Sequence, residues 1–559
     1  MSTTQTPPTY TTVKEHASSL HEVTEVWIGE KVLQLMEDAP FIEQWDHLLE
    51  ICPWATLFQS HCYVATWYRH YSKEYLPIVI KRERGGMLTG LFTLAQHKNG
   101  LITGAGNRIA EYQCWLTADA HDDRFIREAL QEIGQRFPGK RVNLKYLPAG
   151  IPLDWIKKHA SWNRRCILRT FRHPLMIIND EALTKELKKK NRKEKLNRLK
   201  RLGDVKFERV IDYKEFASII DEISLMSDFR KGFLYDKLPF KEDPPRKAFY
   251  LSLFEQGYLH VTVLKLNDSI IASNVSVRAK NGLCLQGINS HAPAYSRYSP
   301  GIIHFLLLGK LMAEEGRPVF DLTPGGDSYK DMLATDYITA YTLSVGDYKY
   351  IVKARLKSKM SRYVKIMAGI TGKKPDELVK TIKNSAGLLR PGKIKRKLAA
   401  MVAGLMGRRK QPVVKSARCW MAPLMDKACT DDLPSIQKDS LQDLVDFDPR
   451  EKQCSRKTFL AAAGERIEAG EHCYTWAEGG TLLACVWVSK ADGIFHSLAG
   501  LYCHAKGRER LPDFIKSVAA ELSATASSSC EKLYIVTDCG EETAFEKAGF
   551  QKIDVVRAK

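Results

Sequence analysis

The segment Leu285–Ala334 constrains the fold of this chain more than any other. It reads as a strand, a loop, an apolar helix that begins at Ser299-Pro300-Gly301, a second strand at Val319–Leu322 and a glycine-rich turn. Serine is a favoured helix N-cap and proline a favoured first helical residue. The first amides of such a helix point free into the strand–helix crevice and attract anions. The segment therefore predicts an anion site, at the amides of Gly301, Ile302 and Ile303.

Length and composition predict a folded chain of three domains or four. At 559 residues the chain is too long for one core. Its 44% hydrophobic and 27% charged content is typical of a folded, soluble protein. No apolar run approaches the roughly 20 residues of a membrane span, and the polar first residues contain no apolar signal core. We therefore expect a cytosolic protein.

The cysteines and histidines give no metal-binding pattern. Thirteen cysteines are scattered along the chain without a CxxC pair, and the fifteen histidines include no HExxH motif. We expect reduced thiols and no metal site.

The formal net charge of +20 is concentrated in two segments, Lys185–Arg201 and Lys353–Lys415. Neither interleaves aromatic residues as a single-strand nucleic-acid binder does. The second segment carries apolar stripes at helical spacing with lysine and arginine around them, which suits peripheral contact with an anionic membrane surface. Packing on a neighbouring domain explains the same pattern.

The chain divides by pattern into five parts. The polar, Pro/Thr-rich start is predicted to be disordered, and three mixed α/β units follow, the second and third separated by the basic helical linker. In the first unit, an acidic stretch before a helix disfavours phosphate. Glu111 and Tyr112, which we expect to be exposed, either face a substrate or form an ordinary loop. The predicted boundaries are 1–24, 25–168, 169–352, 353–415 and 416–559.

The pattern also predicts individual elements within these units. Aromatic residues at helical spacing predict a helix at Ala55–Tyr71, and a second helix is predicted at Arg124–Arg136. A strand is predicted at Leu259–Leu266, and a last hairpin strand at Lys349–Val352 closes the second unit.

Two blocks of sequence resemble a known family. They are YSRYSPGIIHFLL and, further on, FDLTPGGDSYK, and they resemble the BcsL/CelD-like acetyltransferases of the GNAT superfamily, which occur in bacterial polysaccharide clusters. The basic helix at Lys185–Arg201 and the segment from Val26 to Val352 resemble the tandem layout shared with Fem-type transferases. The ending Thr543–Ile553 resembles that of an ordinary GNAT domain. The resemblance implies an α+β, three-layer α/β/α fold, with tandem GNAT acyl-CoA N-acyltransferase domains and a third GNAT-like domain.

The resemblance also implies a site for acyl-CoA, most simply acetyl-CoA, in the second unit. Asp321 is a candidate for orienting or deprotonating the acceptor, or else a buried carboxylate that bonds loop amides. Tyr329 is a candidate acid for the departing thiolate, and Lys330 a candidate for charge stabilisation. His291 lies outside the matched blocks; its position in an exposed loop makes it a candidate for substrate binding and a less favoured alternative base. The expected cofactor-binding residues are Arg297, Ser299, Pro300, Gly301, Ile302 and Ile303.

These features favour an acyl-CoA-dependent N- or O-acyltransferase acting on a sugar or related intermediate of envelope or exopolysaccharide synthesis. One alternative is a Fem-like aminoacyl transferase, whose basic helix would hold aminoacyl-tRNA; otherwise nucleic acid is not an expected partner. Another is a non-catalytic assembly protein at the inner face of the membrane. In the third unit, the turn His504–Arg510 keeps one glycine of a phosphate-binding turn, so we expect binding or dimerisation there rather than catalysis.

Overall fold

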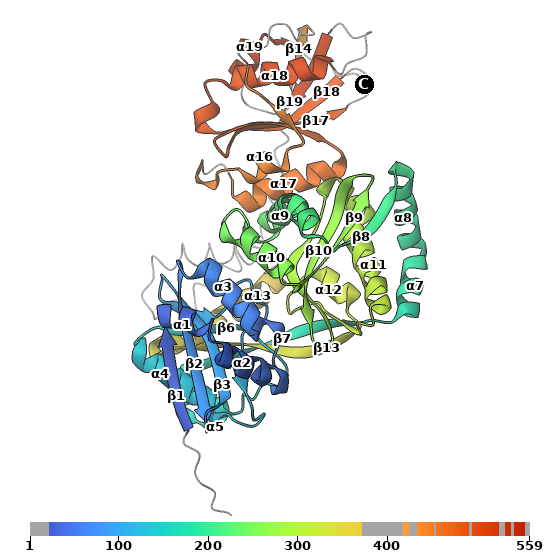
Figure 1. Cartoon of the computed structure of the whole chain (residues 1–559). Helices are drawn as coiled ribbons and strands as arrows, with labels where there is room; N and C mark the ends of the chain where they lie inside the picture. The colour runs from blue at the N-terminus through green and yellow to red at the C-terminus, as the bar shows by residue number, and fades with distance from the viewer. Residues whose placement is uncertain are drawn as a thin grey trace, which may run out of the picture. The chain divides into compact units, whose positions relative to one another are not determined.

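A computed structural model describes residues 22–371, 418–423, 433–451, 454–490, 495–524, 532–537 and 542–553 (Figure 1). The chain forms two compact units, of which the first contains residues 1–171 and 339–351 and the second 172–338 and 352–559. It leaves the first unit in β7 (Cys166–Ile177) and returns in β13 (Asp336–Val345). Within the described residues, no helix is long and apolar enough to cross a membrane.

The first unit is a mixed sheet covered by helices, with an aromatic core. The aromatic residues of the helix predicted at Ala55–Tyr71 are buried, and Tyr63, Trp67 and Tyr68 are at most 1% exposed. The sheet order is β1 (Glu22–Ile28), β2 (Tyr75–Arg84), β3 (Met87–His97), β4 (Leu101–Gly104), β6 (Arg141–Leu147) and β13, and β5 (Leu116–Thr117) pairs with β3. The helices are α1 (Glu30–Leu35), α2 (Ala39–Ile51), η1 (Leu57–Gln59), α3 (His61–Tyr71), α4 (Arg124–Arg136), α5 (Trp155–Lys158) and α6 (Ala160–Arg165).

The second unit begins with a sheet whose central strands are almost entirely buried. The strand predicted at Leu259–Leu266 is confirmed, and Asn267 forms the following turn with a left-handed φ of 53°. The sheet order is β7, β12 (Val319–Asp321), β11 (Gly282–His291), β10 (Ser269–Ala279), β9 (Leu259–Leu266) and β8 (Val205–Val210). The helices are α7 (Asp180–Lys188), α8 (Lys190–Leu202), α9 (Tyr213–Tyr235), α10 (Pro245–Glu255), η2 (Pro293–Tyr298), α11 (Pro300–Glu314) and α12 (Ser328–Leu333).

Strands β11 and β12 run parallel but separate after three residues. Only Gly282–Cys284 pairs with Val319–Asp321, whereas β11 continues to His291 along β10. The edge of β11 that faces β12 is therefore unpaired beyond Cys284 within the described sheet. A strand edge without a neighbouring strand can bond a ligand where side chains do not already hold its backbone groups.

The hairpin strand predicted at Lys349–Val352 is wrong, because these residues belong to helix α13 (Tyr348–Thr371). Asp347 starts this helix: its carboxylate accepts the Tyr350 amide at 2.6 Å, and its carbonyl accepts the Ile351 amide. Four apolar side chains of α13 are more than half exposed, namely Leu356, Met360, Tyr363 and Ile366. The remaining basic linker, residues 372–417, lies outside the described residues, and its membrane contact stays a prediction.

The last part of the second unit contains a separate mixed sheet. Its helix α17 packs on α9, and Phe229, Leu444 and Leu460 share one apolar cluster. The sheet order is β15 (Gln437–Lys438), β16 (His472–Glu478), β17 (Thr481–Lys490), β18 (Phe495–Cys503), β19 (Lys532–Thr537), β14 (Arg418–Pro423) and β20 (Gln551–Ile553). The helices are α16 (Leu441–Val445), η4 (Pro449–Glu451), α17 (Arg456–Ala469), η5 (Ala505–Gly507), α18 (Leu511–Ala524) and α19 (Glu542–Lys547). The expected α+β fold is confirmed.

Candidate active site

A cavity of about 190 Å³ lies beside the end of β11, where this strand has separated from β12. Residues from α9, β10, β11, η2, α11 and α12 line it, together with Ser299, and none of the lining residues in the described part of the chain is a carboxylate. The lining residues that carry the chemistry are Arg230, Asn289, His291, Ser299, Gly301 and Tyr329.

A bulge in β11 directs the strand toward the cavity. The pairing with β10 shifts register so that Gln286 and Gly287 have no partner on that strand, and Gly287 has a left-handed φ of 88°. Helices hold both bulge carbonyls: Tyr250 Oη donates to Gln286 O at 2.8 Å, and Lys231 Nζ donates to Gly287 O at 2.6 Å. These bonds fix the position of the strand end from which the cavity residues extend.

The start of α11 differs from the sequence prediction. Ser299 has the left-handed conformation (φ 54°, ψ 49°), and its side chain does not cap the helix. Its carbonyl accepts the amides of Ile302 and Ile303 at 3.1 and 3.2 Å. The prediction of three free amides is therefore wrong, because the first turn closes on the Ser299 carbonyl and Pro300 has no N–H. Among the described contacts, the Gly301 amide has no partner.

A lysine from the basic helix α8 adds positive charge at this helix start. Lys195 Nζ donates to Ser299 Oγ at 2.7 Å. Arg297, which the sequence favoured for this role, is exposed, and its guanidinium lies over the Tyr298 ring at 4.9 Å. The charge run in the sequence indicated the helix, but not which lysine reaches the site.

His291 is held as a neutral side chain in the cavity. Its Nε2 lies 3.1 Å from Ser296 Oγ. Burial, and secondarily the charge of Arg230, lowers the pKa of His291 to about 4. A neutral imidazole near pH 7 can accept a proton.

Tyr329 lines the cavity from α12 and contacts the end of β11. Asn289 Nδ2 donates to Tyr329 Oη at 2.6 Å, and the phenol ring stacks on Phe305 with centroids 5.6 Å apart. Burial is the main cause that raises the pKa of Tyr329. The phenol therefore keeps its proton near neutral pH and can donate it.

Asp321 and Lys330 do not line the cavity; they hold the turn after β12. Asp321 Oδ1 accepts the Thr323 amide at 2.7 Å and lies 2.6 Å from His173 Nε2. Lys330 Nζ donates to Thr323 O and Oγ1 at 3.1 and 2.9 Å. Thr323 is a β-branched residue with a left-handed φ of 60°, which these contacts stabilise. The contacts agree with the alternative prediction for Asp321, a carboxylate that bonds a loop amide, and the catalytic roles stay predictions.

Residues 187–331 match the family model of the acetyltransferase (GNAT) domain. This segment is a GNAT-type domain. It contains every residue that lines the cavity, as well as Lys195.

Solved structures resemble the chain only distantly. FemX is 12% identical, with a TM-score of 0.39 over 56% of this chain and 98% of its own. The C-terminal domain of a putative lysylphosphatidylglycerol synthetase from Agrobacterium fabrum is 14% identical, with a TM-score of 0.35 over 57% and 95%. A protein of unknown function from Bacteroides thetaiotaomicron is 12% identical, with a TM-score of 0.36 over 55% and 97%. No curated protein matches the chain.

His304 of the GNAT domain predicts a pH-dependent stability. It is 1% exposed, and burial lowers its pKa to about 3. Between this pKa and the ordinary value for histidine, the imidazole is protonated in the unfolded chain but neutral in the folded domain. Stability should therefore fall as the pH falls from about 6.5 toward 3, by about 1.4 kcal/mol per pH unit. His304→Leu should reduce the decrease in melting temperature between pH 7 and pH 4.5. Equal decreases in both proteins would contradict this assignment.

Two residues of the first unit are less accessible than the sequence suggested. Tyr112 is 3% exposed and packs on Phe58, and its carbonyl accepts Gln59 Nε2 at 2.9 Å. The Glu111 carboxylate pairs with Lys145 Nζ at 2.6 Å. The expectation that both are exposed is wrong, because the loop after the Gly104–Gly106 turn folds into the core; their substrate role stays a prediction.

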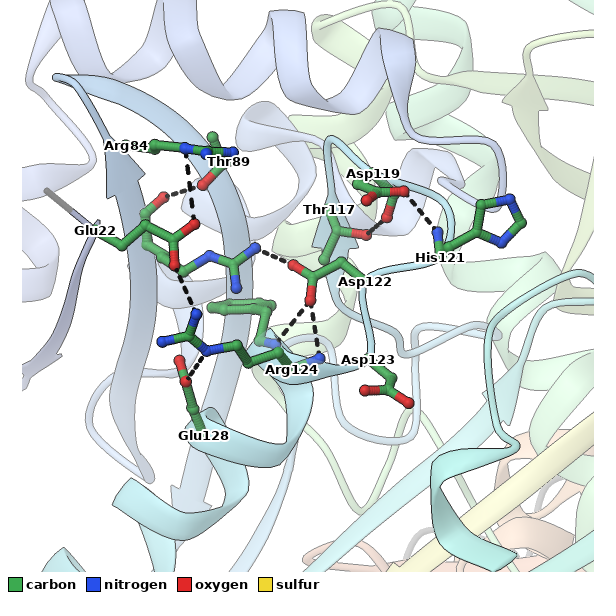
Figure 2. Close-up of polar contacts among 12 residues, drawn as sticks. Glu22, Arg84, Thr89, Thr117, Asp119, His121, Asp122, Asp123, Arg124 and Glu128 are labelled. Carbon is green, nitrogen blue, oxygen red and sulfur yellow. Dashed lines mark hydrogen bonds and ion pairs between the residues drawn. The ribbon is translucent and has the colours of Figure 1, made fainter. Parts of the chain in front are cut away.

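At the start of α4 in this unit, the carboxylate of Asp122 accepts hydrogen bonds from backbone amides, as Figure 2 shows. Asp122 Oδ1 accepts the amides of Arg124 and Phe125 at 2.8 and 3.3 Å, and its other oxygen pairs with Arg82. Burial would raise the pKa of Asp122, but the bonds from Arg82 and the two amides outweigh it and lower the pKa. These two amides are therefore not available to a phosphate.

Gly507, the single glycine of the predicted phosphate-binding turn in the last sheet, is closely packed. A Cβ on Gly507 would lie 3.1 Å from Leu483 O and 3.2 Å from the Trp476 ring. The turn is the short η5 helix, started by His504, whose Nδ1 accepts the Lys506 amide at 3.1 Å. Close packing thus accounts for Gly507 without a phosphate.

Proposed function

We propose that the GNAT domain transfers an acyl group from acyl-CoA to an amine or hydroxyl in the cavity beside β11. The observation that carries this proposal is the separation of β11 from β12 at Cys284, next to a polar cavity inside the segment that matches the acetyltransferase family. Pantetheine contains two amides, which can bond to the edge of a strand that has no neighbouring strand.

The residues at the start of α11 suit the pyrophosphate of CoA. The Gly301 amide and the Lys195 ammonium offer one neutral and one charged donor, and glycine leaves the approach to the backbone open. A Cβ on Gly301 would come within 3.5 Å of His291 Nδ1, so this position adjoins the proposed base.

The cavity supplies the proton transfers that direct acyl transfer needs. The acceptor nitrogen or oxygen attacks the thioester carbonyl, the C–S bond breaks, and the acceptor loses one proton. No carboxylate lines the cavity within the described residues, so we assign the neutral imidazole of His291 as the acceptor of this proton. Tyr329 donates its proton to the departing thiolate. His291 then releases the acceptor's proton to solvent, and the Tyr329 phenolate takes one back from solvent, so both side chains return to their starting states.

We further propose acetyl as the acyl group and a sugar or sugar-derived acceptor of envelope or exopolysaccharide synthesis. This part rests on the resemblance of the blocks around Ser299 and Asp321 to polysaccharide-cluster acetyltransferases. Under this proposal the protein works in the cytoplasm, on a saccharide acceptor at or near the inner membrane face.

Calorimetric titration with acetyl-CoA tests the site. We expect saturable binding to the wild-type protein and at least 30-fold weaker binding to Gly301→Glu, because a carboxylate there repels the pyrophosphate. Lys195→Met should weaken binding about tenfold by removing one charge contact. Lys193→Met, which removes an exposed charge from the same helix, is the matched control and should change little.

The same titration separates the alternatives. Wild-type protein that binds no acetyl-CoA, or a Gly301→Glu protein that binds it normally, would overturn the site. Salt-sensitive binding of tRNA without acetyl-CoA binding would instead indicate an aminoacyl transferase that uses the basic helix α8. Normal acetyl-CoA binding without transfer to any amine or hydroxyl would indicate an assembly protein.

A further inference from the structure

Arg230 on α9 carries the positive charge of the cavity. It is the only lysine or arginine among the lining residues, and it has no ion-pair partner within the described part of the chain. Its Nη1 donates to Asn289 O at 3.2 Å, and its guanidinium carbon lies 5.5 Å from the centre of the Tyr329 ring. Both contacts are with cavity residues, so the guanidinium is held at the cavity wall.

The nearby carboxylates are engaged elsewhere. Asp327 accepts the hydroxyl of Tyr235, and Asp228 accepts the amides of Phe240 and Lys241 at 2.9 and 2.8 Å. A partly buried cation without an anion is unfavourable. The two contacts of Arg230 leave further N–H groups unbonded, and a guanidinium binds a carboxylate through two parallel hydrogen bonds.

We infer that Arg230 binds a carboxylate carried by one of the two reactants in this cavity. The inference rests on the proposed acyl transfer and specifies its substrate class. The carboxylate has two sources: a dicarboxylic acyl group of the donor, or an acid group on the acceptor, such as that of an acidic amino sugar. In both cases the bound carboxylate orients the reactant against the proposed base.

The position of Arg230 would also link binding to rate. Its charge is one cause of the low pKa of His291. A carboxylate that neutralises this charge raises the proton affinity of the imidazole, since the cation no longer opposes protonation. A substrate that fills the subsite therefore meets a stronger base than a neutral analogue does.

The first arm of the test varies the acyl group. Acetyl-CoA and succinyl-CoA are titrated into wild-type protein, Arg230→Gln and Arg230→Lys. If the donor carries the carboxylate, wild-type protein should bind succinyl-CoA at least tenfold more tightly than acetyl-CoA. Arg230→Gln should lose this preference and Arg230→Lys should keep part of it. Lys193→Met, which removes an exposed charge outside the cavity lining, is the control and should keep it fully.

The second arm varies the acceptor. Glucosamine and glucosaminuronic acid, which differ by the carboxylate, are titrated into protein saturated with CoA. If the acceptor carries the carboxylate, the acid should bind at least tenfold more tightly to wild-type protein, and this preference should again be lost in Arg230→Gln.

The outcomes distinguish this inference from the function on which it rests. The inference would be overturned if wild-type protein binds acetyl-CoA but prefers neither succinyl-CoA over acetyl-CoA nor glucosaminuronic acid over glucosamine. The acyltransferase proposal would remain standing. Equal weakening of both donors by Arg230→Gln would assign Arg230 to the CoA moiety and would also overturn it. Loss of acetyl-CoA binding in Gly301→Glu supports the function independently, because Arg230 is unchanged in that variant.

Discussion

Gly282→Ala is expected to disrupt the pairing of β11 with β12 and to destabilise the sheet of the GNAT domain. A Cβ on Gly282 would lie 1.8 Å from the carbonyl oxygen of Val319, closer than any non-bonded contact allows. The atom in the way belongs to the backbone of the paired strand, so no side-chain rotation relieves the clash. We expect the free energy of unfolding of the GNAT domain to fall by about 3 kcal/mol, the upper end of the usual range for overpacking.

Amide hydrogen exchange is the measurement that localises this effect. The described GNAT segment, residues 187–331, contains no tryptophan, so intrinsic tryptophan fluorescence would report other parts of the chain. In Gly282→Ala, the amides of β11 and β12 should lose protection, whereas those of β2 and β3 in the first unit should keep it. Gly326→Ala is the matched control, because nothing lies within 4 Å of the added carbon. Unchanged protection in β11 would refute the expected clash.

His291→Gln is expected to lower kcat by 10²- to 10³-fold while acetyl-CoA affinity stays within threefold. Glutamine can still contact Ser296 but cannot take a proton, and removal of a general base typically costs this much. Because the pKa of His291 is about 4, wild-type kcat/KM should be level between about pH 5.5 and 8 and fall below about pH 5. An ordinary histidine would lose half its activity near pH 6.5.

Asp321→Asn provides the comparison that separates the two candidate bases. Its carboxylate supports the Thr323 turn from outside the cavity lining, so we expect a loss of stability and a kcat within about tenfold of wild type. A much larger loss of kcat in Asp321→Asn than in His291→Gln, with melting temperatures equal, would reverse the assignment.

The sequence predicted regular elements well where one pattern dominates. Strand β9 and helix α4 have the predicted bounds, because their apolar spacing and the flanking turn residues agree. The basic helix was predicted as one element but is divided at Lys189, which lies outside helical geometry between α7 and α8. Lys349–Val352 was wrongly predicted as a strand, because four residues are too few to show whether the apolar spacing is that of a strand or a helix. The helix there is set by the Asp347 cap, whose carboxylate accepts the Tyr350 amide.

The candidate site was predictable in its position but not in its contacts. Sequence spacing located the start of α11 and the block from Asp321 to Lys330. It could not show that Ser299 adopts a left-handed conformation, that Lys195 reaches it from another helix, or that Arg230 lies in the same cavity. These contacts join residues far apart in the chain, and no local pattern encodes them.

The path of the chain through β7 and β13 makes the GNAT domain an insertion within the first unit. Strand β13 completes the sheet of that unit by pairing Tyr341 with Leu147 of β6. The whole insertion must therefore be synthesised before β13 can join this sheet. Closing so long a loop is slow unless its ends are brought together. An insertion that has already folded shortens the effective loop. Synthesis from the N-terminus would therefore favour a folding order in which the inserted domain forms first and the surrounding unit is completed last.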